Sequence, residues 1–152
     1  DLGADHPRAI PIVVNTESAA ALALIHDLPV ILLPCRTGTE HERALSVAED
    51  LENEGLSVEV IDPRTVVPLD KVTILKSVEK TGRLVVVDPA HKSCSVASEI
   101  AALVAQEGFW TLQAPIQRVT SLDCHFPFSP ALEKLVFPNE DKIAEAIYAV
   151  LE

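Results

Sequence analysis

Blocks of hydrophobic residues alternate with polar stretches along this chain, and their spacing predicts strands and helices in regular succession. Two short runs of apolar, mostly β-branched residues, 58–61 and 84–87, predict buried strands. The segment between them has helical spacing, with Asp70 placed to cap its first turn and Gly82 placed to end its last. Because two buried strands joined through a helix form a parallel pair, this stretch indicates a parallel sheet. The side chains expected to face inward from the helix are Val72, Leu75 and Val78.

Similar blocks on both sides of this unit extend the alternation over most of the chain. Strands and helices that alternate in this way predict an α/β fold, a three-layer α/β/α sandwich with a mostly parallel sheet and right-handed crossovers. Residues 28–152 are therefore expected to form one domain, and residues 1–27 an atypical N-terminal segment that is helical. The further elements expected are a strand at 28–33, a helix from Thr39 to Gly55, a helix from Ser95 to Gly108, a strand at 115–119 and a closing helix at 139–151.

Five segments carry a resemblance to a known family, in one order along the chain. They read VEVIDPRTVVPLD at 58–70, SVEKTGRLVVVD at 77–88, EIAAL at 99–103, APIQRVT at 114–120 and PFSPALE at 127–133. Together they resemble the C-terminal domain of the transketolase superfamily, and specifically that of the β subunit of thiamine-diphosphate-dependent 2-oxo acid or acetoin dehydrogenases. The resemblance covers residues 28–151 and implies a sheet of the kind predicted above, with the direction of the fourth strand left open. The segment CSVA at 94–97 is similar to acetoin dehydrogenase β subunits, which favours acetoin as the substrate class.

The resemblance implies an assembly role rather than catalysis for this chain. In the family, thiamine diphosphate and Mg²⁺ are held by two other domains, so no catalytic or cofactor-binding residue transfers to this sequence. The chain alone is expected to be inactive and to bind no thiamine diphosphate. The partners implied are a second copy of the chain, an α subunit and a lipoyl acyltransferase. The alternative is a stand-alone interaction or small-ligand-binding module that kept the fold without the enzyme.

Composition narrows the classes of partner. The formal net charge of −11 and the lack of Lys and Arg clusters argue against nucleic acids and anionic membranes. No apolar run approaches the roughly 20 residues of a membrane span. Three unevenly spaced cysteines suit a reducing compartment, and we therefore expect a cytoplasmic protein.

A strand-end crevice is the first candidate site. In parallel α/β sheets, ligands bind beyond the carboxyl ends of the strands. Loops at that edge carry Asp62, Arg64, Asp88, His91 and Cys94, with Ser93 or Ser95 expected to cap the following helix. An ion pair of Arg64 with a carboxylate is favoured over a ligand role, and any ligand is expected to be a small anion. A closed zinc module is disfavoured because the cysteine spacing does not match that of such a module. A Cys–His nucleophile is disfavoured because nothing in the sequence marks an oxyanion pocket.

A stiff aromatic segment is the second candidate site. The segment contains two of the four phenylalanines of the chain, Phe126 and Phe128. Between them, the ring of Pro127 restricts the backbone. Such segments anchor protein interfaces, although packing on the chain's own sheet is an equal alternative. With the apolar residues of 126–135 and 143–151, this segment predicts a homodimer.

Overall fold

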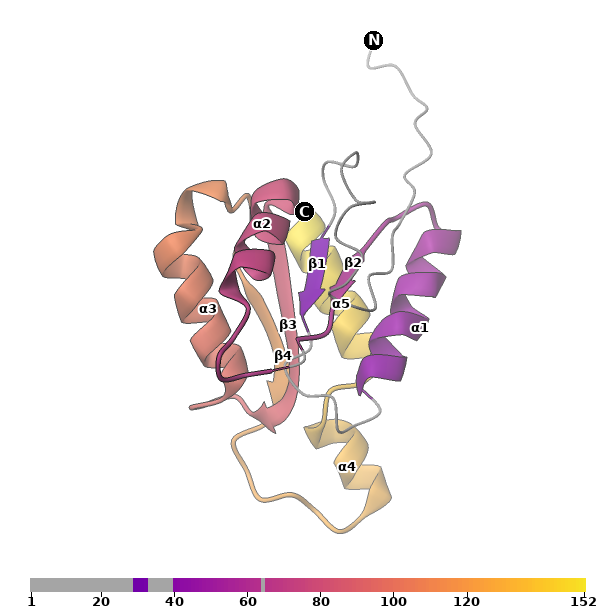
Figure 1. The fold of residues 1–152 in the computed structure, drawn as a ribbon. Coiled ribbons are helices and arrows are strands. Elements are labelled where there is room, and N and C mark those ends of the chain that lie inside the picture. The colour runs from indigo at the N-terminus through magenta and orange to yellow at the C-terminus, as the bar shows by residue number, and fades with distance from the viewer. Residues whose placement is uncertain (1–28, 33–39, 64) are drawn as a thin grey trace.

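One parallel sheet lies between two layers of helices, which confirms the predicted α/β architecture (Figure 1). The computed structural model describes residues 29–32, 40–63 and 65–152. Its elements in chain order are β1 (Pro29–Leu32), α1 (Glu40–Asn53), β2 (Glu59–Ile61), α2 (Lys71–Thr81), β3 (Arg83–His91), α3 (Val96–Glu107), the short 3-10 helix η1 (Phe109–Thr111), β4 (Gln117–Ser121), α4 (Pro130–Val136) and α5 (Glu140–Leu151). Helices α1 and α5 cover one face of the sheet, and α2 and α3 cover the other.

The strands of the described sheet lie in the order β2-β1-β3-β4, and every neighbouring pair is parallel. The direction of the fourth strand, which the sequence left open, is therefore parallel as well. Strand β3 is central, since it pairs with β1 on one side and with β4 on the other. It is also the longest of the described strands. Because all four strands point the same way, their carboxyl ends meet at one edge of the sheet.

Two strands differ from their predicted bounds at this edge. Strand β3 continues to His91, four residues past the hydrophobic run, and its pairing with β4 shifts register between Asp88 and His91. Strand β4 begins at Gln117, two residues later than predicted, and ends at Ser121. The hydrophobic pattern missed both extensions because the added residues are polar or irregularly paired, whereas the pattern reports only regular burial.

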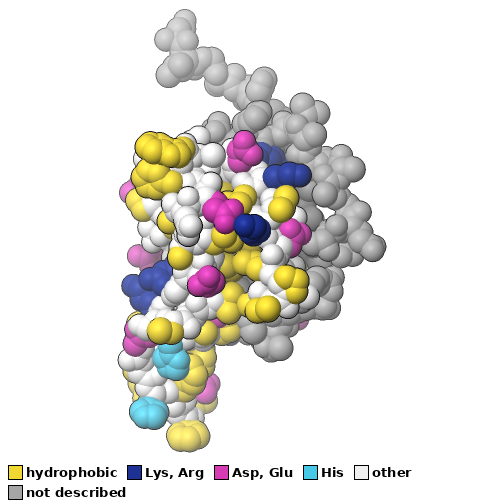
Figure 2. Space-filling model, turned by 60° about the vertical axis from the view of Figure 1, so that its left-hand side comes forward, with side chains coloured by type: hydrophobic (Ala, Val, Ile, Leu, Met, Phe, Trp, Pro, Cys, Tyr) yellow, Lys and Arg dark blue, Asp and Glu magenta, His cyan; other side chains and the backbone are white. Residues whose placement is uncertain are grey.

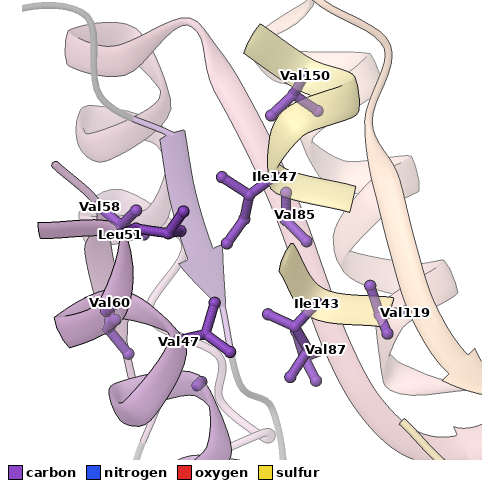
Figure 3. Close-up of a cluster of buried hydrophobic side chains, with 12 residues drawn as sticks. Val47, Leu51, Val58, Val60, Val85, Val87, Val119, Ile143, Ile147 and Val150 are labelled. Carbon is purple, nitrogen blue, oxygen red and sulfur yellow. The ribbon is translucent and has the colours of Figure 1, made fainter. Parts of the chain in front are cut away.

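Among the described residues, the core consists of two hydrophobic clusters, one on each face of the sheet. Successive side chains of β3 alternate between them, so Val85 and Val87 face α1 and α5 while Leu84 and Val86 face α2 and α3. Figure 3 shows the first cluster, in which side chains of α1 and α5 meet over the sheet. Its buried members are Ala44, Val47, Ala48, Leu51, Val58, Val60, Val85, Val87, Val119, Ile143, Ile147 and Val150.

Helix α2 has the predicted ends but a different inward face. Asp70 accepts a hydrogen bond from the Thr73 amide, and Gly82 ends the helix in the left-handed region at φ 68°. Val72, which was expected to pack inward, is 56% exposed, so that prediction is wrong. The inward stripe includes two hydroxyl side chains that a hydrophobic pattern does not count. Its buried residues are Ile74, Ser77, Val78 and Thr81.

The Asp70 cap makes a measurable contribution to stability. Replacing Asp70 with alanine should lower the free energy of unfolding by about 1 kcal/mol, the usual loss at an N-cap. The hydroxyl and then the amide of Thr73 lower the pKa of Asp70 below its usual 3.8. The contribution is therefore fully present above pH 3.8 and is lost as the pH falls through the lower, folded-state pKa. Urea denaturation of both proteins near pH 7 and near pH 2 checks this, and a difference that does not shrink in acid would contradict it.

Some expectations fall on residues without a described structure. The helical segment expected at 1–27 and the cap expected at Thr39 lie outside the described residues. Among the helices that the structure describes, none is long and apolar enough to cross a membrane.

Candidate functional site

The buried carboxylate of Asp88 holds the carboxyl end of β3 against α3. Asp88 is 3% exposed, and its two oxygens accept hydrogen bonds from the amides of Ala90 at 2.9 Å and Ala97 at 3.0 Å. The second amide belongs to the first turn of α3, where backbone N–H groups lack helical partners. Ser95 caps the same helix by accepting from the Ser98 amide, which confirms the predicted cap. Asp88 therefore fills the position that an external anion would take at this helix.

A second carboxylate joins the loop after β3 to the loop after β4. Asp123 accepts hydrogen bonds from the Ser93 amide at 3.0 Å and from the Ser93 hydroxyl at 2.7 Å. The hydroxyl and then the amide of Ser93 lower the pKa of Asp123, and the charges of His91 and Lys92 act in the same direction. The side chain is exposed, so this contact fixes loop geometry at the surface of the protein.

An aromatic stack continues from these loops. The His91 ring lies on Phe126, with centroids 4.5 Å apart and planes 17° apart, and Phe126 in turn lies on Phe137 at 4.9 Å. The Nε2 atom of His91 is 2.9 Å from the carbonyl oxygen of Cys124. The predicted aromatic segment is thus anchored at its first phenylalanine, while Phe128 two residues later is fully exposed. Pro127 between them is half-buried.

Helix α4 extends this apolar surface beyond the sheet. In Figure 1 the helix stands apart from the three layers, below the carboxyl ends of the strands. Lys142 fixes its last turn by donating to the carbonyls of Leu135 at 2.7 Å and Phe137 at 2.9 Å. Figure 2 shows hydrophobic and histidine side chains gathered at this end of the molecule. We call the exposed apolar surface the aromatic end, and its members are Leu122, Phe126, Phe128, Leu132 and Leu135.

The predicted crevice residues serve separate contacts. Asp88 binds backbone amides and His91 supports the aromatic end, whereas Asp62 is half-buried after β2. Cys94 is exposed and lines a groove of about 650 Å³, which lies between the loop before α2 and the side of α3. Arg64 lies outside the described residues, so its predicted ion pair stays a prediction. Binding of a small anion in the crevice also stays a prediction.

Sequence reasoning missed helix α4, although a signal was present. Ser129 directly before Pro130 is a common start of a helix, because proline fits the first helical position and serine the position before it. The Ser93–Asp123 and His91–Cys124 contacts had no such signal, because they join residues 30 and 33 positions apart.

Comparison with known proteins assigns the family. Residues 35–143 match a family model that is described as "Transketolase, C-terminal domain". The chain belongs to the transketolase C-terminal domain family. This confirms the resemblance inferred from the five sequence segments.

Relatives with curated names include β subunits of an acetoin oxidoreductase and of pyruvate dehydrogenase. The β subunit of acetoin:2,6-dichlorophenolindophenol oxidoreductase from Bacillus subtilis (strain 168) is 45% identical over 114 residues, which are 75% of this chain and 33% of that protein. The corresponding subunit of Cupriavidus necator is 49% identical over 68% of this chain and 31% of that protein. The pyruvate dehydrogenase E1 component subunit beta of Staphylococcus epidermidis is 45% identical over 76% of this chain and 35% of that protein. The chain therefore spans about a third of the length of these relatives.

A solved structure shares the fold of this transketolase C-terminal domain. The structure, described as a split gene transketolase in an inactive β4 tetramer, superposes with a TM-score of 0.67 at 23% identity. The match covers 82% of this chain and 39% of that one. At this identity the match supports the fold alone.

Proposed function

We propose that this domain serves assembly in the β subunit of a thiamine-diphosphate-dependent acetoin or 2-oxo acid dehydrogenase. In this proposal it forms a two-fold contact with a second copy and presents a docking surface for the lipoyl acyltransferase, within an enzyme that also contains an α subunit. The observation that carries the proposal is the aromatic end, an exposed apolar surface on a domain that matches about a third of its relatives. Reaction chemistry is assigned to the rest of the enzyme.

The cofactor does not fit the described part of this domain. Among the described residues, no group of three or more His, Cys, Asp or Glu side chains could hold a metal ion. At the described N-terminus of α3, the Asp88 carboxylate already accepts from the Ala97 amide, which leaves that helix end unsuited to a diphosphate. We therefore assign thiamine diphosphate to other domains of the enzyme and derive no step through it.

A second copy of the chain is the occupant that suits the aromatic end. Phe128 is fully exposed and Phe126 is 44% exposed, yet the stack on His91 and Phe137 holds the segment in one place. A rigid aromatic anchor loses little conformational entropy when it is buried. On α4, Glu133 and Lys134 place opposite charges next to each other on the exposed surface. A two-fold contact places the same surface of the two copies together. The negative charge of Glu133 in one copy can then face the positive charge of Lys134 in the other.

The outer face of α1 suits a basic docking domain. Arg43 is the only Lys or Arg in the helix, and it is half-buried with its guanidinium donating to the Pro138 carbonyl at 2.8 Å. The surface that remains is acidic and would steer a positively charged domain towards it. Glu54 just beyond the helix accepts a hydrogen bond from the Tyr148 hydroxyl at 2.6 Å, which raises the pKa of Tyr148. The exposed acidic residues of this face are Glu42, Glu49, Asp50, Glu52 and Glu54.

Titration with the isolated subunit-binding domain of the acyltransferase tests the docking role. The double variant Glu49→Gln/Asp50→Asn should weaken binding roughly fivefold, since each surface charge contributes about 0.5 kcal/mol. Binding of the unaltered chain should also weaken as salt is raised. The control is Glu79→Gln/Glu99→Gln, which removes two exposed acids from the opposite helical layer and should leave the affinity unchanged. Equal losses in both double variants would assign the effect to net charge and contradict a specific face.

A further inference from the structure

Strand β4 leaves one side of its backbone without a strand partner in the described sheet. It is the last strand in the order and pairs only with β3. The Ser121 carbonyl accepts from the Lys92 amide at 3.0 Å, so Ser121 points towards the β3 side. Backbone polar groups of successive residues in a strand point to alternate sides. The N–H and C=O groups of Arg118 and Thr120 therefore point outward, in the arrangement that accepts an additional strand.

A groove of about 350 Å³ runs along this open edge. One wall is formed by β4 and the residue after it, Leu122, and the other by α5. The α5 wall includes Ala146 and Ala149, whose small side chains leave space beside the strand. The lining of the groove thus includes every residue of β4.

The groove is basic although the chain is acidic as a whole. Lys92, Arg118 and Lys142 line it, against the single carboxylate of Glu145. Arg118 donates to the Ser98 hydroxyl at 2.7 Å and to the Lys92 carbonyl at 3.1 Å, and Lys142 donates to two backbone carbonyls. These acceptors are uncharged, although the charge of Lys92 also acts on the nearby Asp123 carboxylate. Among the described residues, none of the three cations has a salt bridge within 4.0 Å.

We propose that this groove binds an extended, acidic segment of a partner protein, which adds to the sheet as a strand beside β4. Backbone hydrogen bonds to Arg118 and Thr120 would hold the segment, and its carboxylates would meet Lys92, Arg118 and Lys142. A second copy of this chain is a poor occupant, because two β4 edges would bring the same three cations together. The lining of the groove shares only Leu122 with the aromatic end and no residue with the acidic face of α1. The proposed site goes beyond the assembly role proposed above.

Backbone amide NMR with two synthetic peptides tests the proposal. The probe is an eight-residue peptide of alternating Glu and Val, and the control peptide replaces each Glu with Lys. The acidic peptide should shift the amide signals of Arg118 and Thr120 and slow their hydrogen exchange, and the basic peptide should not. Lys92→Glu should weaken binding of the acidic peptide about fivefold or more. Lys76→Glu, an equal charge change on the exposed side of α2, should leave it unchanged.

Thr120→Pro separates strand addition from simple charge attraction. Proline removes the outward N–H at an edge position that tolerates it, without removing any cation. Under the proposal, this variant loses binding while its spectrum elsewhere stays that of a folded protein. Unchanged binding by Thr120→Pro, or equal binding of both peptides to the unaltered chain, would overturn the proposal. Concentration-dependent shifts of the β4 amides without any peptide would identify a second copy as the occupant and would also overturn it.

Discussion

Replacing Asp88 with alanine is expected to lower the free energy of unfolding by about 3 kcal/mol, because it leaves two amides without their acceptor. The carboxylate is 3% exposed and accepts from Ala90 and Ala97, so water cannot fully replace it in the folded protein. One of these amides lies in the first turn of α3. The loss of its hydrogen bond to Asp88 should loosen the contact between α3 and β3. Chemical denaturation followed by circular dichroism measures the change.

Asp123→Ala is the matched control for this prediction. Asp123 also accepts two hydrogen bonds, both from Ser93, but its side chain is exposed. Water can solvate Ser93 after the substitution, so the loss of stability should be much smaller than for Asp88→Ala. If the two variants lost the same stability, or if Asp88→Ala lost none, the role assigned to the buried carboxylate would be wrong.

The sequence predicts the parts of this fold that depend on local patterns. Asp70 and Gly82 mark the ends of α2 because capping depends on residues within one turn. The continuous apolar run from Leu84 to Val87 predicts a strand buried on both faces, because this pattern is also local. Val72 was misplaced because the true inward stripe uses Thr81, whose hydroxyl is satisfied by the Ser77 carbonyl and can therefore be buried.

The sequence predicted that the residues of the candidate site lie near one another. It did not predict the contacts that each side chain makes. Asp88, His91 and Cys94 were expected at the carboxyl end because parallel strands end there. The sequence does not say that the Asp88 carboxylate turns back to α3 or that the His91 ring lies on Phe126. These contacts depend on how the loop after β3 meets the loop after β4, about 30 residues later. Aromatic residues and prolines in 126–130 still predicted the position of the exposed apolar surface.

Replacing Phe128 with serine is expected to weaken self-association of the chain by about 2 kcal/mol or more, the loss typical of a central aromatic residue at an interface. That change corresponds to roughly a thirtyfold higher dissociation constant. Phe128 is fully exposed in the single chain and should be covered in the pair, and each two-fold contact would contain it twice. Because the side chain is exposed in the single chain, the substitution should not change the free energy of unfolding of the monomer. Circular dichroism and denaturation of the dilute protein check that the fold is kept.

Trp110→Ser provides the control for exposed aromatic surface in general. Trp110 is 93% exposed and follows α3 in η1, whose Phe109 it contacts edge to face. It lies outside the aromatic end, so its removal should leave self-association unchanged. The comparison therefore separates a specific contact from nonspecific adhesion of apolar side chains.

Sedimentation equilibrium of the unaltered chain, Phe128→Ser and Trp110→Ser tests the assembly role most directly. At rising concentration, the unaltered chain and Trp110→Ser should approach twice the 16.4 kDa mass of one chain. Over the same concentrations, Phe128→Ser should stay near the mass of one chain. An unaltered chain that remains a monomer at the highest concentration, or a Trp110→Ser variant that dissociates as Phe128→Ser does, would contradict assembly through the aromatic end.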